Sequence, residues 1–167
     1  MNKYIPACLA LTMIAMILSF SSKNKMALDG AWAIVEVQTV KANGTVTSVF
    51  PIESEAVFAH NYYSFCWTSH HSTTRSWQMT DSVKLDRINQ SIVNSGTYEV
   101  KDSLLTTKAI FAMNPVFVNG LSKFKCSFNG DTLILTGLNV SSSDNIPNPL
   151  YASGSHIVNK LVRLSKR

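Results

Sequence analysis

The sequence predicts a single all-β domain over residues 28–164, built as an eight-stranded antiparallel up-and-down β-barrel with one short helix in a long loop. Short runs rich in β-forming residues follow one another along the chain, and several alternate apolar and polar residues. Most connections between these runs are short, which fits antiparallel neighbours in a sandwich or a barrel. Closing the sheet into a barrel removes its exposed edges, so we expect the barrel.

Turn signals separate the expected strands. Asn43-Gly44 follows the first strand, His60-Asn61 divides two β-rich runs, and Asn129-Gly130-Asp131 is a strong hairpin turn. The expected strands are 31–40, 55–59, 62–68, 96–100, 103–112, 121–128, 132–140 and 156–164.

Two longer connections interrupt this pattern. In residues 69–95, Asp81 is a possible N-cap, and apolar residues follow it at rough helical spacing, which predicts a short helix near 82–90. This helix could plug one end of the barrel or form a lid over a cavity. Residues 141–155 form a polar loop that contains proline.

Composition and charge exclude several classes of protein. Charged residues make up 15% of the 167 residues and hydrophobic residues 46%, which argues against intrinsic disorder. The net charge is +5, but the basic residues are scattered rather than gathered in a stripe or helix, apart from a small cluster at Arg163, Lys166 and Arg167. We therefore expect no nucleic-acid partner.

The N-terminus has the pattern of a signal peptide. After a basic start, residues 5–20 carry no charge, a run shorter than the roughly 20 residues of a spanning helix. Ser19 and Ser21 suit a cut after residue 21, so we expect a signal peptide over 1–21, a secreted or periplasmic protein, and no membrane span in the mature chain. An uncleaved anchor is the alternative. Cys8 lies too early in the apolar run to be a lipidation site.

A pair of motifs at the two ends of the domain resembles the lipocalins and the wider calycin superfamily. Gly30-Ala31-Trp32 opens the first strand, and Arg163 lies in the last. In those proteins a Gly-x-Trp starts the barrel and a basic residue of the last strand packs across the indole. The resemblance implies that Trp32 is buried, with Arg163 stacked on its ring.

The second half of the chain resembles the bacterial lipocalin-like domain proteins. The similar segments are 96–100, Asn114-Pro115 and 128–133, and the helix-containing connection 69–95 precedes them as it does in that group. The resemblance implies a barrel able to hold a small apolar ligand.

Strand parity supplies candidate residues for a pocket at the mouth of the barrel opposite Trp32. Charged neighbours mark the outward face, so Phe124 and Phe128 point inward beside Lys123 and Lys125, and the same argument turns Tyr98 and Phe111 inward. Phe58 and Phe65 are added as aromatic residues whose face their neighbours do not fix. If Trp32 points inward, Glu36 and Gln38 follow, unless a bulge turns Glu36 outward. The predicted ligand-binding residues are Glu36, Gln38, Phe58, Phe65, Tyr98, Phe111, Phe124 and Phe128.

No motif in the sequence indicates chemistry. There is no Gly-x-Ser-x-Gly and no glycine-rich phosphate loop, and His60, His70 and His71 lack the spacing of metal ligands. We expect no cofactor and no metal. Cys66 and Cys126 lie on strands that are not neighbours, so we expect two free thiols.

The function expected from these observations is binding of a small apolar or amphipathic molecule inside the barrel, without chemistry. Two alternatives remain. One is a solidly packed barrel that acts as an interaction module through loops 69–95 and 141–155, and the other is a calycin-type enzyme. The sequence leaves the oligomeric state open.

Overall fold

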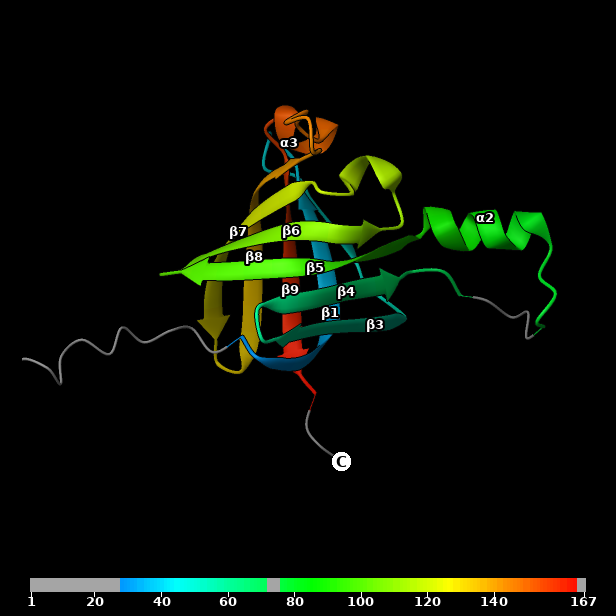
Figure 1. Ribbon diagram of the computed structural model, residues 1–167, viewed down its shortest axis with the longest axis horizontal. Coiled ribbons are helices and arrows are strands. Elements are labelled where there is room, and N and C mark those ends of the chain that lie inside the picture. Colours follow the sequence, from blue (N-terminus) through cyan, green and yellow to red (C-terminus); the bar gives the residue numbers. More distant parts are fainter. Residues whose placement is uncertain (1–27, 72–75, 165–167) are drawn as a thin grey trace, which may run out of the picture.

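The computed structural model describes residues 28–71 and 76–164, and the expected signal peptide over 1–21 lies outside these residues. The strands form one barrel, from which a helix projects to the side (Figure 1). The strands are β1 (Gly30–Val40), β2 (Val46–Val49), β3 (Glu53–Ala59), β4 (Tyr62–Thr68), β5 (Ser91–Lys101), β6 (Leu104–Ala112), β7 (Leu121–Asn129), β8 (Thr132–Ser141) and β9 (His156–Arg163). The helical segments are α2 (Asp81–Asn89), η1 (Pro115–Phe117) and α3 (Pro149–Ala152).

Antiparallel pairing of neighbours closes the sheet. The strand order is β2-β1-β3-β4-β5-β6-β7-β8-β9, and β1 also pairs with β9. β1 is shared between two partners, because Gly30–Trp32 pair with β3 while Val37–Val40 pair with the short β2. The closed eight-strand barrel is confirmed, and β2 is an additional strand that the sequence analysis missed.

The connections between the strands contain the expected helix, but its N-cap, the start of the next strand and two further helical turns differ from the prediction. α2 lies where the helix near 82–90 was predicted, but its N-cap is Thr80 rather than Asp81. β5 begins at Ser91, several residues before the predicted start at 96. α3 and η1 were not predicted, and each is a single turn that begins with proline after an asparagine whose side chain accepts a backbone N–H. Among the described residues, no helix is long and apolar enough to cross a membrane.

Three β-bulges change which residues point into the barrel. Val35 in β1, Ile110 in β6 and Leu138 in β8 each lack a partner in the register of the neighbouring strand. All three side chains are exposed. An extra residue reverses the alternation of inward and outward side chains in the part of the strand that follows it. On the mouth side of each bulge, the residues that point inward are therefore one position further along the chain than strict alternation predicts.

The closed end of the barrel is built around Trp32. Its side chain is 1% exposed, and the Arg163 guanidinium carbon lies 4.3 Å from its ring centroid. The indole N–H donates to the Leu28 carbonyl (2.9 Å), and Arg163 donates to the Asp29 carbonyl (2.8 Å). The residues just before β1 are therefore fastened across this end, and the predicted contact between Trp32 and Arg163 is confirmed.

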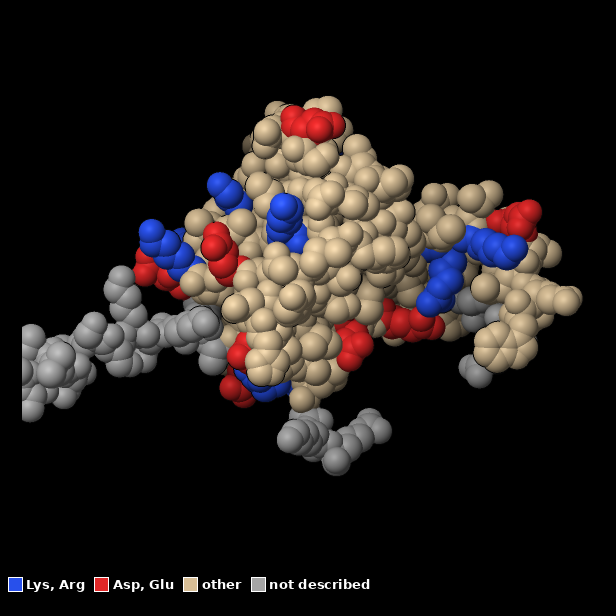
Figure 2. All heavy atoms as spheres, viewed as in Figure 1, with Lys and Arg blue, Asp and Glu red and all other residues tan. Residues whose placement is uncertain are grey.

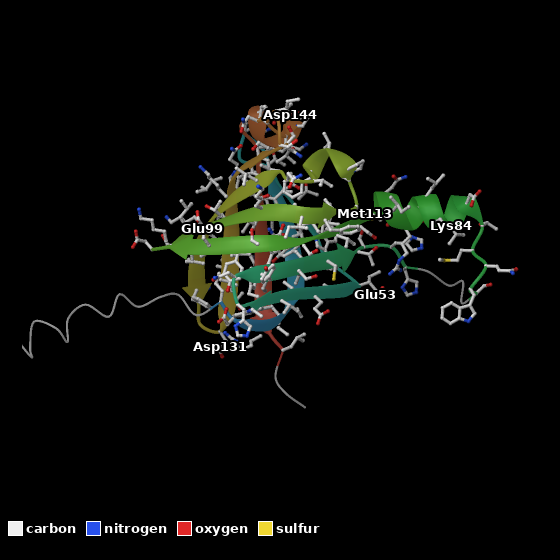
Figure 3. All side chains as sticks on the ribbon, viewed as in Figure 1. Glu53, Lys84, Glu99, Met113, Asp131 and Asp144 are labelled. Atoms are coloured by element: carbon white, nitrogen blue, oxygen red, sulfur yellow. The ribbon has the colours of Figure 1, made fainter. Side chains whose placement is uncertain are left out.

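The other end of the barrel is the mouth. Figure 3 shows Asp131, in the turn between β7 and β8, at the bottom of the molecule and Asp144, next to α3, at the top. Met113, which follows β6, lies toward α2. The mouth is thus bordered by α3, η1 and the start of β5, where α2 joins the barrel.

Candidate functional site

A cavity of about 750 Å³ opens at the mouth of the barrel. It extends from residues of the strands near the core, such as Phe58 and Leu105, to the covering segments at Val116 and 146–151. A volume of several hundred Å³ is typical of a site for one small ligand. The cavity lies on the side opposite Trp32, where the sequence analysis placed a pocket.

Three of the predicted residues line this cavity. Phe58 lies at its inner end, where it is buried among the core residues, and Phe65 and Phe124 pack against the same core from β4 and β7. The parity argument was correct for Phe124, because β7 itself contains no bulge and the extra residue at this point lies in β8.

The prediction that Phe111 points inward is wrong. Its side chain is 58% exposed and is not among the cavity residues. Lys108 does point outward, and Thr107 and Ala109 are buried, but the bulge at Ile110 turns Phe111 to the outer surface. Ala112 is buried in its place.

Tyr98 and Phe128 lie at the closed end of the barrel, where Phe128 is 44% exposed, and neither lines the cavity. Tyr98 meets Phe58 edge to face with ring centroids 5.3 Å apart, and its hydroxyl donates to Asp29 (2.6 Å). Phe128 lies 6.2 Å from the Trp32 ring. The alternation of side chains along a strand shows which face a residue is on but not how far along the barrel axis it lies. Tyr98 and Phe128 were therefore assigned to the pocket, although they belong to the closed end.

Glu36 and Gln38 lie outside the barrel, so their assignment to the cavity is wrong, and the alternative of a bulge that turns Glu36 outward is correct. The bulge at Val35 turns Val37 into the cavity and Glu36 to the surface. There the Glu36 carboxylate accepts hydrogen bonds from Lys160 (2.8 Å), Ser48 (2.7 Å) and Gln38 (2.8 Å). These bonds, led by that from Lys160, lower the pKa of Glu36 to about 2.

Sequence reasoning missed the polar part of the cavity. Tyr63, Thr107, Ser122 and Asn159 are all buried and all line it. The signal for Tyr63 was the two-residue turn at His60-Asn61, where both residues have positive φ, because this turn pairs Tyr63 with Phe58. Residues paired across a hairpin share a face, so an inward Phe58 implies an inward Tyr63.

The segment 142–151 covers part of the mouth. The Ser142 N–H donates to the Ile146 carbonyl (2.9 Å) and so closes a short loop, after which α3 brings Tyr151 over β8. Gly137 makes this possible, since a methyl group at its position would overlap the Tyr151 hydroxyl. Burial raises the pKa of Tyr151.

α2 stands beside the mouth, and two side-chain contacts join it to β3 and to the residues just after β4. Arg87 contacts Glu53 at 2.6 Å, and His70 Nδ1 lies 2.7 Å from Asp86. Ile88 and Asn89 at the end of this helix line the cavity, which confirms that the connection 69–95 borders the opening.

A second hollow of about 550 Å³ lies between α2 and the outer side of β3–β5. Unlike the cavity, it is lined by the charged residues Glu53, Glu55, Lys84 and Arg87, together with Cys66. In Figure 2 the coloured charged atoms lie mostly at the margins of the molecule and on α2, while the middle of the face shown is largely free of them.

Cys66 and Cys126 are free thiols, as expected. Cys66 points outward from β4, and Cys126 is buried inside the barrel, so the two side chains lie on opposite faces of the sheet wall. In residues 28–71 and 76–164, no cluster of three or more His, Cys, Asp or Glu side chains could hold a metal ion.

No protein-family model matches the chain, and no curated protein matches it. Among solved structures, a lipocalin-like protein from Bacteroides uniformis is similar over 82% of this chain and 98% of that chain, with 13% sequence identity and a TM-score of 0.43. The chain itself forms a closed antiparallel barrel whose eight main strands pair in chain order, with Trp32 beneath Arg163 at the closed end.

Proposed function

We propose that this protein binds a small apolar or amphipathic molecule in the cavity at the mouth of its barrel. The observation that carries the proposal is the cavity itself, about 750 Å³ in a barrel that side chains could have filled. Its walls include Phe58, Phe65, Phe124 and Leu135. An apolar ligand that enters would remove its own surface and that of these side chains from water, which is the main source of binding free energy at such a site.

The cavity favours ligand binding over the alternative of a solidly packed interaction module. A filled barrel would place apolar side chains where this barrel has space, since protein interiors normally pack as densely as organic crystals. The segment 142–151 and the end of α2 border the opening, so they are positioned to contact a ligand as it enters.

The proposed function contains no chemical step. The ionisable side chains in the described lining of the cavity are the hydroxyls of Tyr63 and Tyr151, and burial raises the pKa of both. Neither faces a carboxylate or an imidazole within that lining, which general acid–base catalysis would need. We therefore propose a binding protein rather than an enzyme.

We also propose that the protein is exported, on the strength of the sequence pattern in residues 1–21. N-terminal sequencing of the protein from a fractionated source culture tests this. A mature chain that begins after residue 21, outside the cytoplasm, supports export, and an intact N-terminus on a cytoplasmic protein contradicts it.

Binding can be tested with Nile red, an uncharged dye that fluoresces more strongly in apolar surroundings. We expect saturable binding to the purified protein and its loss in Phe124→Glu, which places a charge in the cavity. The matched control is Phe111→Glu, the same substitution on the outer surface of the barrel, where Phe111 is exposed.

The two variants separate the outcomes. Equal dye binding by Phe124→Glu and the unmodified protein would put the site elsewhere, and no saturable binding to the unmodified protein would contradict the proposal. If the dye binds in the cavity, native mass spectrometry of protein purified from its source should identify a co-purified small molecule.

A further inference from the structure

The described lining of the cavity is uncharged. In the part of the chain that the structure describes, its lining contains no Lys, Arg, His, Asp or Glu. An ion that leaves water needs an opposite charge or several hydrogen bonds to offset the loss of hydration. A carboxylate or ammonium group on a ligand would meet no such charge here.

Three basic side chains of α2 and β9 have partners outside the cavity. Arg87 pairs with Glu53, and Lys84 pairs with Asp81, both beside the second hollow. On β9, Lys160 donates to Glu36 on the outer face. These three cations are therefore directed away from the cavity and already have partners.

One polar atom of the described cavity wall, the Tyr63 hydroxyl oxygen, makes no hydrogen bond of ordinary geometry. The Tyr63 side chain is 5% exposed, and the Thr107 side chain lies near enough to lower the pKa of the hydroxyl without forming such a bond. A buried hydroxyl in this state is destabilising, and a ligand or a water that accepts its proton in a hydrogen bond would relieve the cost. Burial raises the pKa of Tyr63 to about 12, with Thr107 opposing the rise, so the hydroxyl keeps its proton at neutral pH.

The other buried polar residues of the wall are also neutral. Thr107 and Ser122 are partners in the β6–β7 register, and Asn159 lies on β9 opposite Leu135. All three line the cavity. They offer hydroxyl and amide groups, which suit a dipolar group of a ligand rather than an ion.

We infer that the cavity selects uncharged ligands with an apolar body and a hydrogen-bond acceptor, such as an ester, ketone or ether oxygen, which the Tyr63 hydroxyl binds. This inference rests on the proposed function and narrows the class of ligand. Its physical basis is the combination of a lining without ionic groups and a buried donor without an acceptor.

The test is displacement of Nile red from the full-length protein at pH 8 by three ligands whose main carbon chain has the same number of carbons, counting the carbonyl carbon. Methyl laurate is uncharged and carries an acceptor, laurate is anionic, and dodecane has neither a charge nor an acceptor. We expect methyl laurate to displace the dye at a concentration at least about tenfold lower than laurate, because one unpaired buried charge costs more than a neutral hydrogen bond contributes.

The role of Tyr63 is tested by Tyr63→Phe, which removes a single oxygen atom. We expect the affinity for methyl laurate to fall about tenfold, the usual effect of one lost hydrogen bond, and the affinity for dodecane to stay unchanged. The unchanged dodecane affinity also shows that the cavity of the variant is intact. Tyr62→Phe is the matched control, since Tyr62 is the adjacent residue and is 61% exposed on the outer face.

Each result bears on the inference separately from the proposed function. If laurate binds as tightly as methyl laurate, or if Tyr63→Phe leaves the ester affinity unchanged while Nile red still binds, the inference is wrong and ligand binding stands. If neither the dye nor any of the three ligands binds, both are wrong.

Discussion

Trp32 and Arg163 are direct partners in the β1–β9 register, and the guanidinium carbon lies 4.3 Å from the centroid of the indole. Gly30 belongs to the same arrangement. Its φ of +136° is in the region that favours glycine, and a methyl group there would overlap Arg163 Nη1. The Gly-x-Trp motif and the distant arginine are thus parts of a single structure that seals the closed end of the barrel.

Replacement of Trp32 by alanine should destabilise the fold strongly. The indole fills the closed end, so its loss leaves a large void, and we expect the free energy of unfolding to fall by about 3–5 kcal/mol. Urea denaturation followed by circular dichroism measures this. Trp77→Ala is the control, because that indole is fully exposed, and an equal effect of the two substitutions would contradict the structure.

The cover formed by α3 should depend on Gly137. An added methyl group would overlap the Tyr151 hydroxyl and approach its ring, so Gly137→Ala should force α3 outward and cost about 1–3 kcal/mol of stability. The double variant Gly137→Ala with Tyr151→Phe should recover part of this loss, since it removes the overlapping oxygen. Thermal unfolding of the unmodified protein and the two variants measures it, and a Gly137→Ala protein as stable as the unmodified one would refute the contact.

The sequence was sufficient for the barrel because its signals are local. Strand runs, hairpin turns and the helix near 82–90 each depend on a few neighbouring residues, whereas the contact of Trp32 with Arg163 was expected from the resemblance to the lipocalins. The position of the cavity opposite Trp32 could also be predicted, because one filled end leaves the other as the open end.

The site residues were harder to predict because neither a bulge nor the position of a residue along the barrel axis has a clear signal in the neighbouring sequence. The bulge at Val35 turns Glu36 to the outer face, and the bulge at Ile110 does the same to Phe111. Before each bulge, the alternation assigned the inward face correctly, since Ile34 and Ala109 are buried. Tyr98 shows the second difficulty, since its face was right but its position along the axis was not. In contrast, Thr107 and Ser122 had the right parity and were overlooked because they are polar.

The two thiols should differ in reactivity. Burial raises the pKa of Cys126 to about 12, while the pKa of Cys66, at the outer hollow, is raised chiefly by partial burial and then by Glu55. Because the thiolate is the reactive form, an alkylating agent at pH 8 should modify Cys66 first and Cys126 only on unfolding, with Cys66 slower than a free cysteine. Mass spectrometry of peptides after timed alkylation tests this, with Cys66→Ser as the control. Modification of Cys126 before Cys66 would show that the structure around them is wrong.

The Glu36 network should make stability depend on pH in acid. The pKa of Glu36 is lowered from its usual value of about 4.5 to about 2, so the folded state favours the ionised form. Its contribution is therefore fully present above the unfolded-state pKa of about 4.5 and is lost as the pH falls from there to about 2. Glu36→Gln should lower the free energy of unfolding by about 1 kcal/mol at pH 6, as expected for an ion pair near the surface, and by almost nothing at pH 2.

Lys160→Met removes the main partner of Glu36, so adding Glu36→Gln to it should have less effect at pH 6 than Glu36→Gln alone. Urea unfolding at pH 6, 4 and 2 measures these differences, and an effect of Glu36→Gln that is the same at all three pH values would exclude this role of the carboxylate.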